Sequence, residues 1–175
     1  IGKLEKLISL DLEYCSLQKL PDSFVNLKLL TILNLSGNSL KKLPHNFDNI
    51  SLLKELYLSG NSLKSIPKSI DKLISLEQLD LSWNQIVNLK YIFSLIALKN
   101  LNISSTKIKK LPHEIEKLQS LQSLKFNYNE DYIEMDSGLS KLNNLSYMSF
   151  FGSEATPRLS RKEFKNRNDI NQYFK

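Results

Sequence analysis

The chain contains few of the residue types that commonly carry chemistry or crosslinks. Its 175 residues include one cysteine, one tryptophan, two histidines, five glycines and five prolines. A single cysteine cannot form an internal disulfide, which argues against the disulfide-capped architectures of eukaryotic cell surfaces. No stretch approaches the ~20 consecutive apolar residues that a membrane-spanning helix needs. With 41% hydrophobic and 24% charged residues, the composition is that of a soluble globular domain.

Motifs for cofactors and catalysis are missing as well. The sequence has no GxGxxG, no Walker-type phosphate loop, no HExxH and no CxxC. No arrangement of nucleophile, base and orienting group is suggested either. We therefore expect a non-enzymatic protein that has no cofactor, no metal and no small-molecule substrate.

The dominant positive feature is an internal repeat. Segments starting at Leu7, Leu30, Leu53, Leu76, Leu98, Leu121 and Leu145 align with steps of 23, 23, 23, 22, 23 and 24 residues. The best-formed unit reads Leu30-x-x-Leu33-x-Leu35-x-x-Asn38-x-Leu40-x-x-Leu43-Pro44-x-x-Phe47-x-x-Ile50. A fixed period of this length indicates a stacked repeat architecture. Ile1 and Leu4 fit the end of a preceding unit, so we expect a leader or further repeats before them.

These units resemble the leucine-rich-repeat family, in the subclass with 23-residue LxxLxLxxNxLxxLPxxI/FxxLxx repeats of bacterial proteins and intracellular scaffolds. The resemblance covers residues 1 to about 153. It implies an α/β repeat solenoid, a right-handed horseshoe arc with short parallel strands on the concave face. The convex face is expected to hold irregular, 3-10 or helical segments. The resemblance also implies protein–protein binding.

The physical chemistry of the repeat agrees with this fold. A short strand such as residues 55–57 buries its central leucine only when the next unit stacks on it. Strands that return every 23 residues run parallel, since each needs a long crossover. The asparagine position should pair buried backbone groups at the corner after each strand, because an amide both donates and accepts. Cys15, Asn38, Asn61, Asn84, Thr106, Asn129 and Ser153 occupy it. We expect Cys15 to be a member of this ladder rather than a reactive thiol.

The pattern decays toward the C-terminus. Repeat four is one residue short and carries Lys90 in place of proline, which is compatible with a local bend. Residues 130–134 replace the usual outer leg of repeat six. In residues 154–175, Ser160 and Glu163 have the spacing of a capping box, and Ile170, Tyr173 and Phe174 share one helical edge. We expect a helical cap on the last core layer, and a partner-binding helix is the alternative.

The histidines do not suggest a site. His45 and His113 each follow the Leu-Pro of a repeat, three repeats apart. Stacked strands place them roughly 14 Å or more from each other, too far to share a metal.

The predicted binding surface is the concave face, where side chains alternate around the buried strand leucines. It mixes aromatic side chains with small polar ones, a composition typical of protein-binding surfaces. The residues predicted to contact a partner are Asp11, Glu13, Tyr14, Asn34, Glu55, Tyr57, Gln78, Asp80, Trp83, Asn102, Lys125, Tyr128, Tyr147 and Phe151. The alternative is that these aromatics only shield the strands. The early part of this face is acidic, which disfavours nucleic acid.

A second surface follows from the net charge of +6. Lysines recur just after the strands, at Lys19, Lys41, Lys42, Lys64, Lys109 and Lys110. They are predicted to form a basic edge, interpreted first as a solubilising surface. Its functional alternative is an anionic partner, such as a polyanion or a membrane surface. A third alternative is that the chain is the recognition domain of a larger receptor or enzyme. The uniform Leu-Pro units favour a bacterial origin, and both the cell surface and the cytoplasm stay open as compartments.

Overall fold

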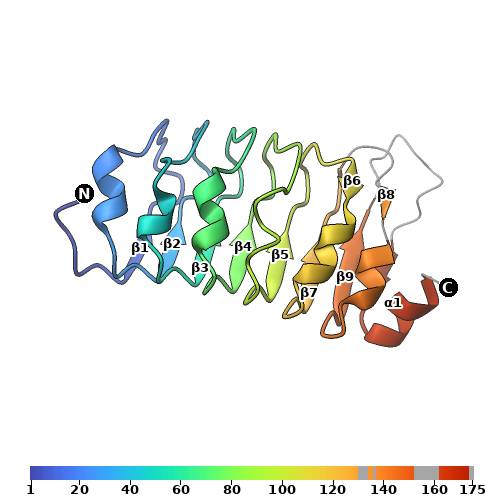
Figure 1. The fold of residues 1–175 in the computed structure, drawn as a ribbon. Helices are drawn as coiled ribbons and strands as arrows, with labels where there is room; N and C mark the ends of the chain where they lie inside the picture. The colour runs from blue at the N-terminus through green and yellow to red at the C-terminus, as the bar shows by residue number, and fades with distance from the viewer. Residues whose placement is uncertain (130–133, 136, 152–161, 174–175) are drawn as a thin grey trace.

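In the computed structural model, the described residues are 1–129, 134–135, 137–151 and 162–173. Figure 1 shows an elongated row of repeats with the two termini at opposite ends. Each repeat adds one short strand to a common sheet, as the leucine spacing predicts. The parallel strands are β1 (Ser9–Asp11), β2 (Ile32–Asn34), β3 (Glu55–Tyr57), β4 (Gln78–Asp80), β5 (Asn100–Asn102), β7 (Ser123–Lys125) and β9 (Tyr147–Phe150).

The strands pair residue for residue. Leu33 lies opposite Leu10 and Leu56, and the same central position continues through Leu79, Leu101 and Leu124 to Met148. From Leu33 onward this central row is buried. The shortened fourth repeat does not shift the register, so its missing residue is absorbed outside the strands.

The return legs carry 3-10 helices on the opposite side of the core. They are η1 (Asp22–Asn26), η2 (Phe47–Asn49), η3 (Lys68–Lys72), η4 (His113–Lys117) and η5 (Ser137–Lys141). Prolines 21, 67 and 112 directly precede η1, η3 and η4 with φ between −75° and −68°, as expected for a residue whose ring fixes φ. Repeat four, which has Lys90 instead, forms a turn over residues 90–94. A second parallel sheet joins β6 (Lys110–Leu111) to β8 (Glu134–Met135).

The core is one continuous column of leucine, isoleucine and phenylalanine side chains. Phe24, Phe47, Ile70 and Ile115 plug it from the return legs and are fully buried. In the first repeat, Leu7, Leu10, Leu12 and Leu17 are only partly buried. The hydrophobic stabilisation is therefore concentrated in the inner repeats.

The asparagine ladder forms as predicted in the inner repeats. The amide nitrogen of Asn61 donates to the carbonyls of Leu35 (2.9 Å) and Leu58 (3.1 Å), and its oxygen accepts from the Leu40 N–H (2.9 Å). Asn38 and Asn84 repeat this pattern. Cys15 occupies the same position but is exposed, and its thiol contacts only the Glu13 carbonyl at 3.5 Å among the described interactions. Cys15 thus holds the ladder position predicted for it, but in this first described repeat its side chain makes only a local contact and does not link two repeats. Ser153 lies outside the described residues.

The C-terminal segment differs from the expected helix. Residues Lys162–Phe164 form β10, which pairs antiparallel with β9. The helix α1 (Arg167–Tyr173) begins later, where the Asn166 side-chain oxygen accepts the Asp169 N–H at 3.0 Å. The predicted helix beginning at the Ser160 capping box is therefore wrong for residues 162–164, which form a strand. Phe164 in this strand is buried and stacks on Phe150, with the ring centroids 5.9 Å apart. Ser160 itself lies outside the described residues, as do residues 130–133 of the sixth repeat.

Of the predicted helical edge, Ile170 is fully buried in the common core. The side chain of Tyr173 and all of Phe174 lie outside the described part. The capping role of residues 154–175 stays a prediction.

Candidate recognition surface

The strand register arranges the predicted binding residues in rows that cross the concave face. The first row runs Ser9, Ile32, Glu55, Gln78, Asn100, Ser123 and Tyr147. The second row runs Asp11, Asn34, Tyr57, Asp80, Asn102, Lys125 and Ser149. Both rows flank the central buried position, so the structure brings these side chains to one side of the sheet.

Much of the second row stabilises the fold. One carboxylate oxygen of Asp80 accepts from the Ser82 N–H (2.8 Å) and hydroxyl (2.6 Å), and the other accepts from the Asn102 amide (3.1 Å). Asn34 and Asn102 each accept the backbone N–H two residues later at 3.1 Å. These side chains close the turn after each strand. Asp80 is thereby a carboxylate held in one orientation.

Tyr57 is tied to Glu55 in the same way. Its hydroxyl donates to a Glu55 carboxylate oxygen at 2.8 Å. Burial raises the pKa of Tyr57 to about 12, with further contributions from the hydrogen bond to Glu55 and from the negative charges of Glu55 and Asp80. Losing the phenolic proton would replace a good hydrogen bond by repulsion between two anions.

Serines in and just beyond the strands are less accessible than side-chain alternation implies. Ser36, Ser82, Ser104 and Ser149 are all at least 91% buried. The neighbouring repeats crowd this row, and Ser59 and Ser82 bond through their hydroxyls at 2.9 Å. These serines form the floor of the concave face rather than its contact surface.

The turn directly before the asparagine ladder carries the most exposed aromatic side chains. At this position Tyr14, Trp83 and Tyr128 have φ of 52°, 54° and 54°, and they are 78%, 66% and 56% exposed. The same position in repeats two and three is glycine, with Gly37 at φ 65° and Gly60 at φ 64°. Each of these residues donates its N–H to the next repeat, for example Trp83 to Ser104 at 2.9 Å. A positive φ is strained for a bulky residue and relaxed for glycine.

The two glycines open a hollow between two of these aromatics. We call it the aromatic slot, about 670 Å³ in volume and lined by Glu13, Tyr14, Ser36, Gly37, Ser59, Gly60, Asp80 and Trp83. The Tyr14 ring leans over Gly37, where an added Cβ would overlap it. A Cβ at Gly60 would meet only Gly37 backbone atoms at 3.5 Å, an ordinary contact. Neither glycine is among the residues predicted from the sequence, although a glycine where other repeats carry tyrosine or tryptophan is a readable signal.

Three other predicted aromatics, Tyr128, Tyr147 and Phe151, lie at the C-terminal end of the face. Tyr128 meets Phe151 edge to face with centroids 6.0 Å apart. Lys125 lies 6.0 Å from the centre of the Tyr147 ring. Apart from Tyr57, which is tied to Glu55 in β3, the predicted aromatics therefore form two clusters, one at the slot and one over the last repeats.

The predicted lysine edge is interrupted. Lys19, Lys41, Lys42 and Lys64 are exposed on the first three repeats, whereas Val87 and Asn88 take the lysine positions in repeat four. Lys109 and Lys110 lie instead beside a hollow of about 700 Å³, the lysine hollow. It is lined by Val87, Asn88, Leu89, Lys90, Phe93, Ser94, Lys107, Lys109, Lys110, Pro112, Glu114 and Lys117. Sequence reasoning noted Lys90 but not its grouping with Lys107 and Lys117.

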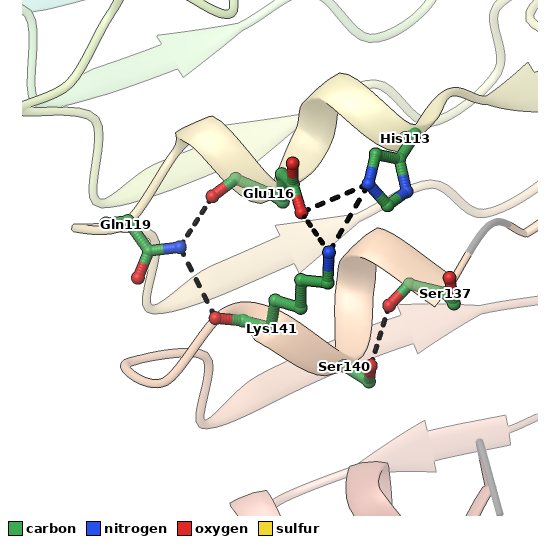
Figure 2. Close-up of polar contacts among 6 residues, drawn as sticks. All are labelled: His113, Glu116, Gln119, Ser137, Ser140 and Lys141. Carbon is green, nitrogen blue, oxygen red and sulfur yellow. Dashed lines mark hydrogen bonds and ion pairs between the residues drawn. The ribbon is translucent and has the colours of Figure 1, made fainter.

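His113 belongs to a polar cluster between η4 and η5, shown in Figure 2. Lys141 Nζ lies 2.7 Å from a Glu116 carboxylate oxygen, which also contacts His113 Nε2 at 3.2 Å. The hydrogen bond from Lys141 holds the pKa of Glu116 below its ordinary value. Gln119 donates to the carbonyls of Glu116 (2.6 Å) and Lys141 (3.3 Å). The cluster ties two return legs together.

The described residues contain no group of three or more His, Cys, Asp or Glu side chains placed to hold a metal ion. None of their helices has the length and apolar character to cross a membrane.

Known proteins place this geometry in a family. Family models described as leucine-rich repeat match residues 43–86 and residues 6–27 and 29–50. No curated protein matches the sequence. Among solved structures, an internalin (InlF) from Listeria monocytogenes is 24% identical with a TM-score of 0.75, the match covering 87% of this chain and 43% of the internalin.

Two other solved structures are more similar in sequence. The leucine-rich-repeat ectodomain of a plant membrane receptor kinase from Arabidopsis thaliana, in complex with CASPARIAN STRIP INTEGRITY FACTOR 2, is 28% identical with a TM-score of 0.72, covering 86% of this chain and 20% of that one. A leucine-rich-repeat protein of Leptospira interrogans is 26% identical with a TM-score of 0.62, covering 87% and 50%. The chain thus spans half or less of each of these solved chains. By its repeat, its fold and these matches, the chain belongs to the leucine-rich-repeat proteins.

Proposed function

We propose that the chain recognises a partner protein on its concave face, with Tyr14, Trp83 and Tyr128 as the main contacts. Leucine-rich-repeat proteins generally serve as protein-interaction scaffolds rather than enzymes. The Arabidopsis ectodomain, which was solved in complex with another factor, supports a protein or peptide partner. The 23-residue units with Leu-Pro return legs favour the bacterial and scaffold subclass, and the Leptospira structure supports a bacterial origin.

The observation that carries this proposal is the conformation of the three aromatics. A non-glycine residue in the left-handed region costs about 1–2 kcal/mol, and glycine takes that place in repeats two and three. The fold therefore does not need an aromatic there. Side chains more than half exposed recover little of this cost by burial. Strained, exposed aromatic residues are the kind of group that contributes strongly to binding when a partner covers them.

The test replaces each of the three aromatics by glycine, the residue that repeats two and three already use. Wild type and triple variant are immobilised, and the proteins that each retains from an extract are compared at low and high salt. We expect a partner that survives high salt on the wild type and is lost from the variant. If the triple variant retains the same partner as the wild type, the proposal is contradicted. The variant should stay folded, since glycine keeps the backbone N–H bonds that these three positions donate to the next repeat.

A second candidate function is supported by the lysine hollow. Five lysines and Glu114 line it, over an apolar floor of buried Leu89 and Phe93. Such a site suits an anionic group attached to an apolar body, and its affinity should fall with added salt. Changing Lys90 and Lys107 together to glutamine should abolish retention of anionic vesicles if this surface acts in place of the concave face. A matched change of Lys41 and Lys64, outside the hollow, should leave retention unchanged.

A further inference from the structure

The aromatic slot has a chemistry of its own, which deepens the proposed function and rests on it. Its walls are Tyr14 and Trp83, and its charged lining residues are Glu13 and Asp80, both acidic. Its floor is the backbone of Gly37 and Gly60 with the serines beside them. Two aromatic side chains and two carboxylates around one hollow favour a cation, because the faces of aromatic rings and carboxylates both present negative charge.

The spacing of the two aromatic side chains suits one cation. Tyr14 and Trp83 stand three repeats apart, and the Tyr14 ring leans one repeat inward over Gly37. With neighbouring strands about 4.8 Å apart, Gly37 and Trp83 are separated by two strand spacings, roughly 10 Å. A cation midway between them comes within the ~6 Å reach of a cation–π contact on both sides.

The carboxylates favour a group that donates several hydrogen bonds at fixed angles. Asp80 is held by the Ser82 N–H and hydroxyl and by the Asn102 amide, so its orientation is set before a ligand arrives. Glu13 is exposed at the opposite wall, next to Tyr14. A guanidinium is planar, stacks on aromatic faces and presents several N–H donors in its plane, whereas an ammonium is a compact and strongly hydrated charge.

We propose that the aromatic slot binds an arginine side chain of the partner protein, stacked between Tyr14 and Trp83 and paired with Glu13 and Asp80. Gly60 is the permissive residue of the site. An aromatic side chain there would fill the slot, and Tyr14, Trp83 and Tyr128 show that the turn accepts one. The absence of a side chain at Gly60 is what makes room for the guanidinium.

The test uses N-acetyl-arginine amide as the probe and the fluorescence of Trp83, the one tryptophan of the chain, as the readout. We expect a saturable change with a dissociation constant on the order of 1 mM, a range accessible to direct titration. N-acetyl-citrulline amide has nearly the same shape without the charge and should give no saturable change. Equal responses to both probes would overturn the proposal.

Variants separate the slot from the rest of the face. Gly60→Tyr should abolish the response and Gly60→Ala should keep it, because both carry the positive φ of 64° but only tyrosine fills the hollow. Glu13→Gln should weaken binding several-fold, whereas Glu114→Gln on the return leg should not. If Gly60→Tyr does not fold, Tyr14→Gly removes one wall and should weaken binding at least several-fold. An unchanged response in Glu13→Gln and in Gly60→Tyr or Tyr14→Gly would refute the assignment.

The outcome for the slot is separable from that for the whole face. If the arginine probe does not bind but the triple glycine variant still loses its high-salt partner, the arginine assignment fails and concave recognition stands. If the probe binds normally and the triple variant keeps its partner, the slot binds arginine but does not serve recognition.

Discussion

Backbone strain at Trp83 can be measured by comparing two replacements of the same side chain. Trp83→Gly and Trp83→Ala both remove the indole, so the packing that it loses is common to them. They differ because the residue keeps a φ near 54°, donating its N–H to the Ser104 carbonyl at 2.9 Å. Alanine in this region costs about 1–2 kcal/mol that glycine avoids. Glycine loses about 0.5–1 kcal/mol more conformational entropy on folding.

The midpoints of these two ranges make Trp83→Gly more stable than Trp83→Ala by roughly 0.7 kcal/mol. Urea unfolding measures this difference in the free energy of unfolding. It is monitored by far-ultraviolet circular dichroism because both variants lack the tryptophan whose fluorescence would otherwise report it. Gln78 in β4 provides the control. At this ordinary strand position the alanine variant should be more stable than the glycine variant by about 0.5–1 kcal/mol. If Trp83→Ala is as stable as Trp83→Gly, or more stable, the strain argument is refuted.

Three further predictions concern the fold and its charges. Asn61→Ala should cost about 2–4 kcal/mol in urea unfolding because it leaves the buried Leu40 N–H unpaired and removes one of the two amide hydrogen bonds that the Leu35 and Leu58 carbonyls each accept, whereas Cys15→Ala should stay within about 0.5 kcal/mol. Tyr57 should ionise with a midpoint near pH 12, measured as the part of the alkaline absorbance change that the Tyr57→Phe variant lacks. Its contribution to the stability of the fold should be lost as the pH rises from the ordinary tyrosine pKa toward about 12. An ionisation midpoint near pH 10 would contradict this. Glu116 has a lowered pKa in the fold, so its contribution to stability is present above the ordinary glutamate pKa and is lost as the pH falls through the lowered pKa. Glu116→Gln should therefore flatten the acid side of a plot of melting temperature against pH. An unchanged plot would show that the contact with Lys141 does not stabilise the fold in this way.

The repeat could be predicted from the sequence because its signals are local and periodic. Leucine spacing places a buried side chain at Leu33, Leu56 and Leu79, and stacking then leaves one register for the strands. The asparagine ladder could also be predicted, because the buried backbone groups in the turn after each strand need both a donor and an acceptor. Its exception, Cys15, shows the limit of periodic reasoning, since burial depends on the neighbouring repeat as well as on the phase.

The candidate site was only partly predictable. Alternation indicates which way a strand side chain points but not how closely the next repeat crowds it, so Ser82 and Ser104 are buried. The aromatic slot depends on the Tyr14 ring leaning over Gly37, a contact between repeats. The lysine hollow depends on how Lys90 and the turn after it replace a proline and a 3-10 helix. The strand at residues 162–164 likewise depends on a distant partner, β9, which overrides the local capping signal.

The central claim is that the concave aromatics, and not the return legs, contact the partner. A photo-reactive benzoylphenylalanine placed at Ser105, between Trp83 and Tyr128 along the turn row, tests this directly against the same group at the exposed His45. The account predicts a crosslinked protein from position 105 that the triple glycine variant loses, and none from position 45. Crosslinking from position 45 with none from position 105 would contradict it.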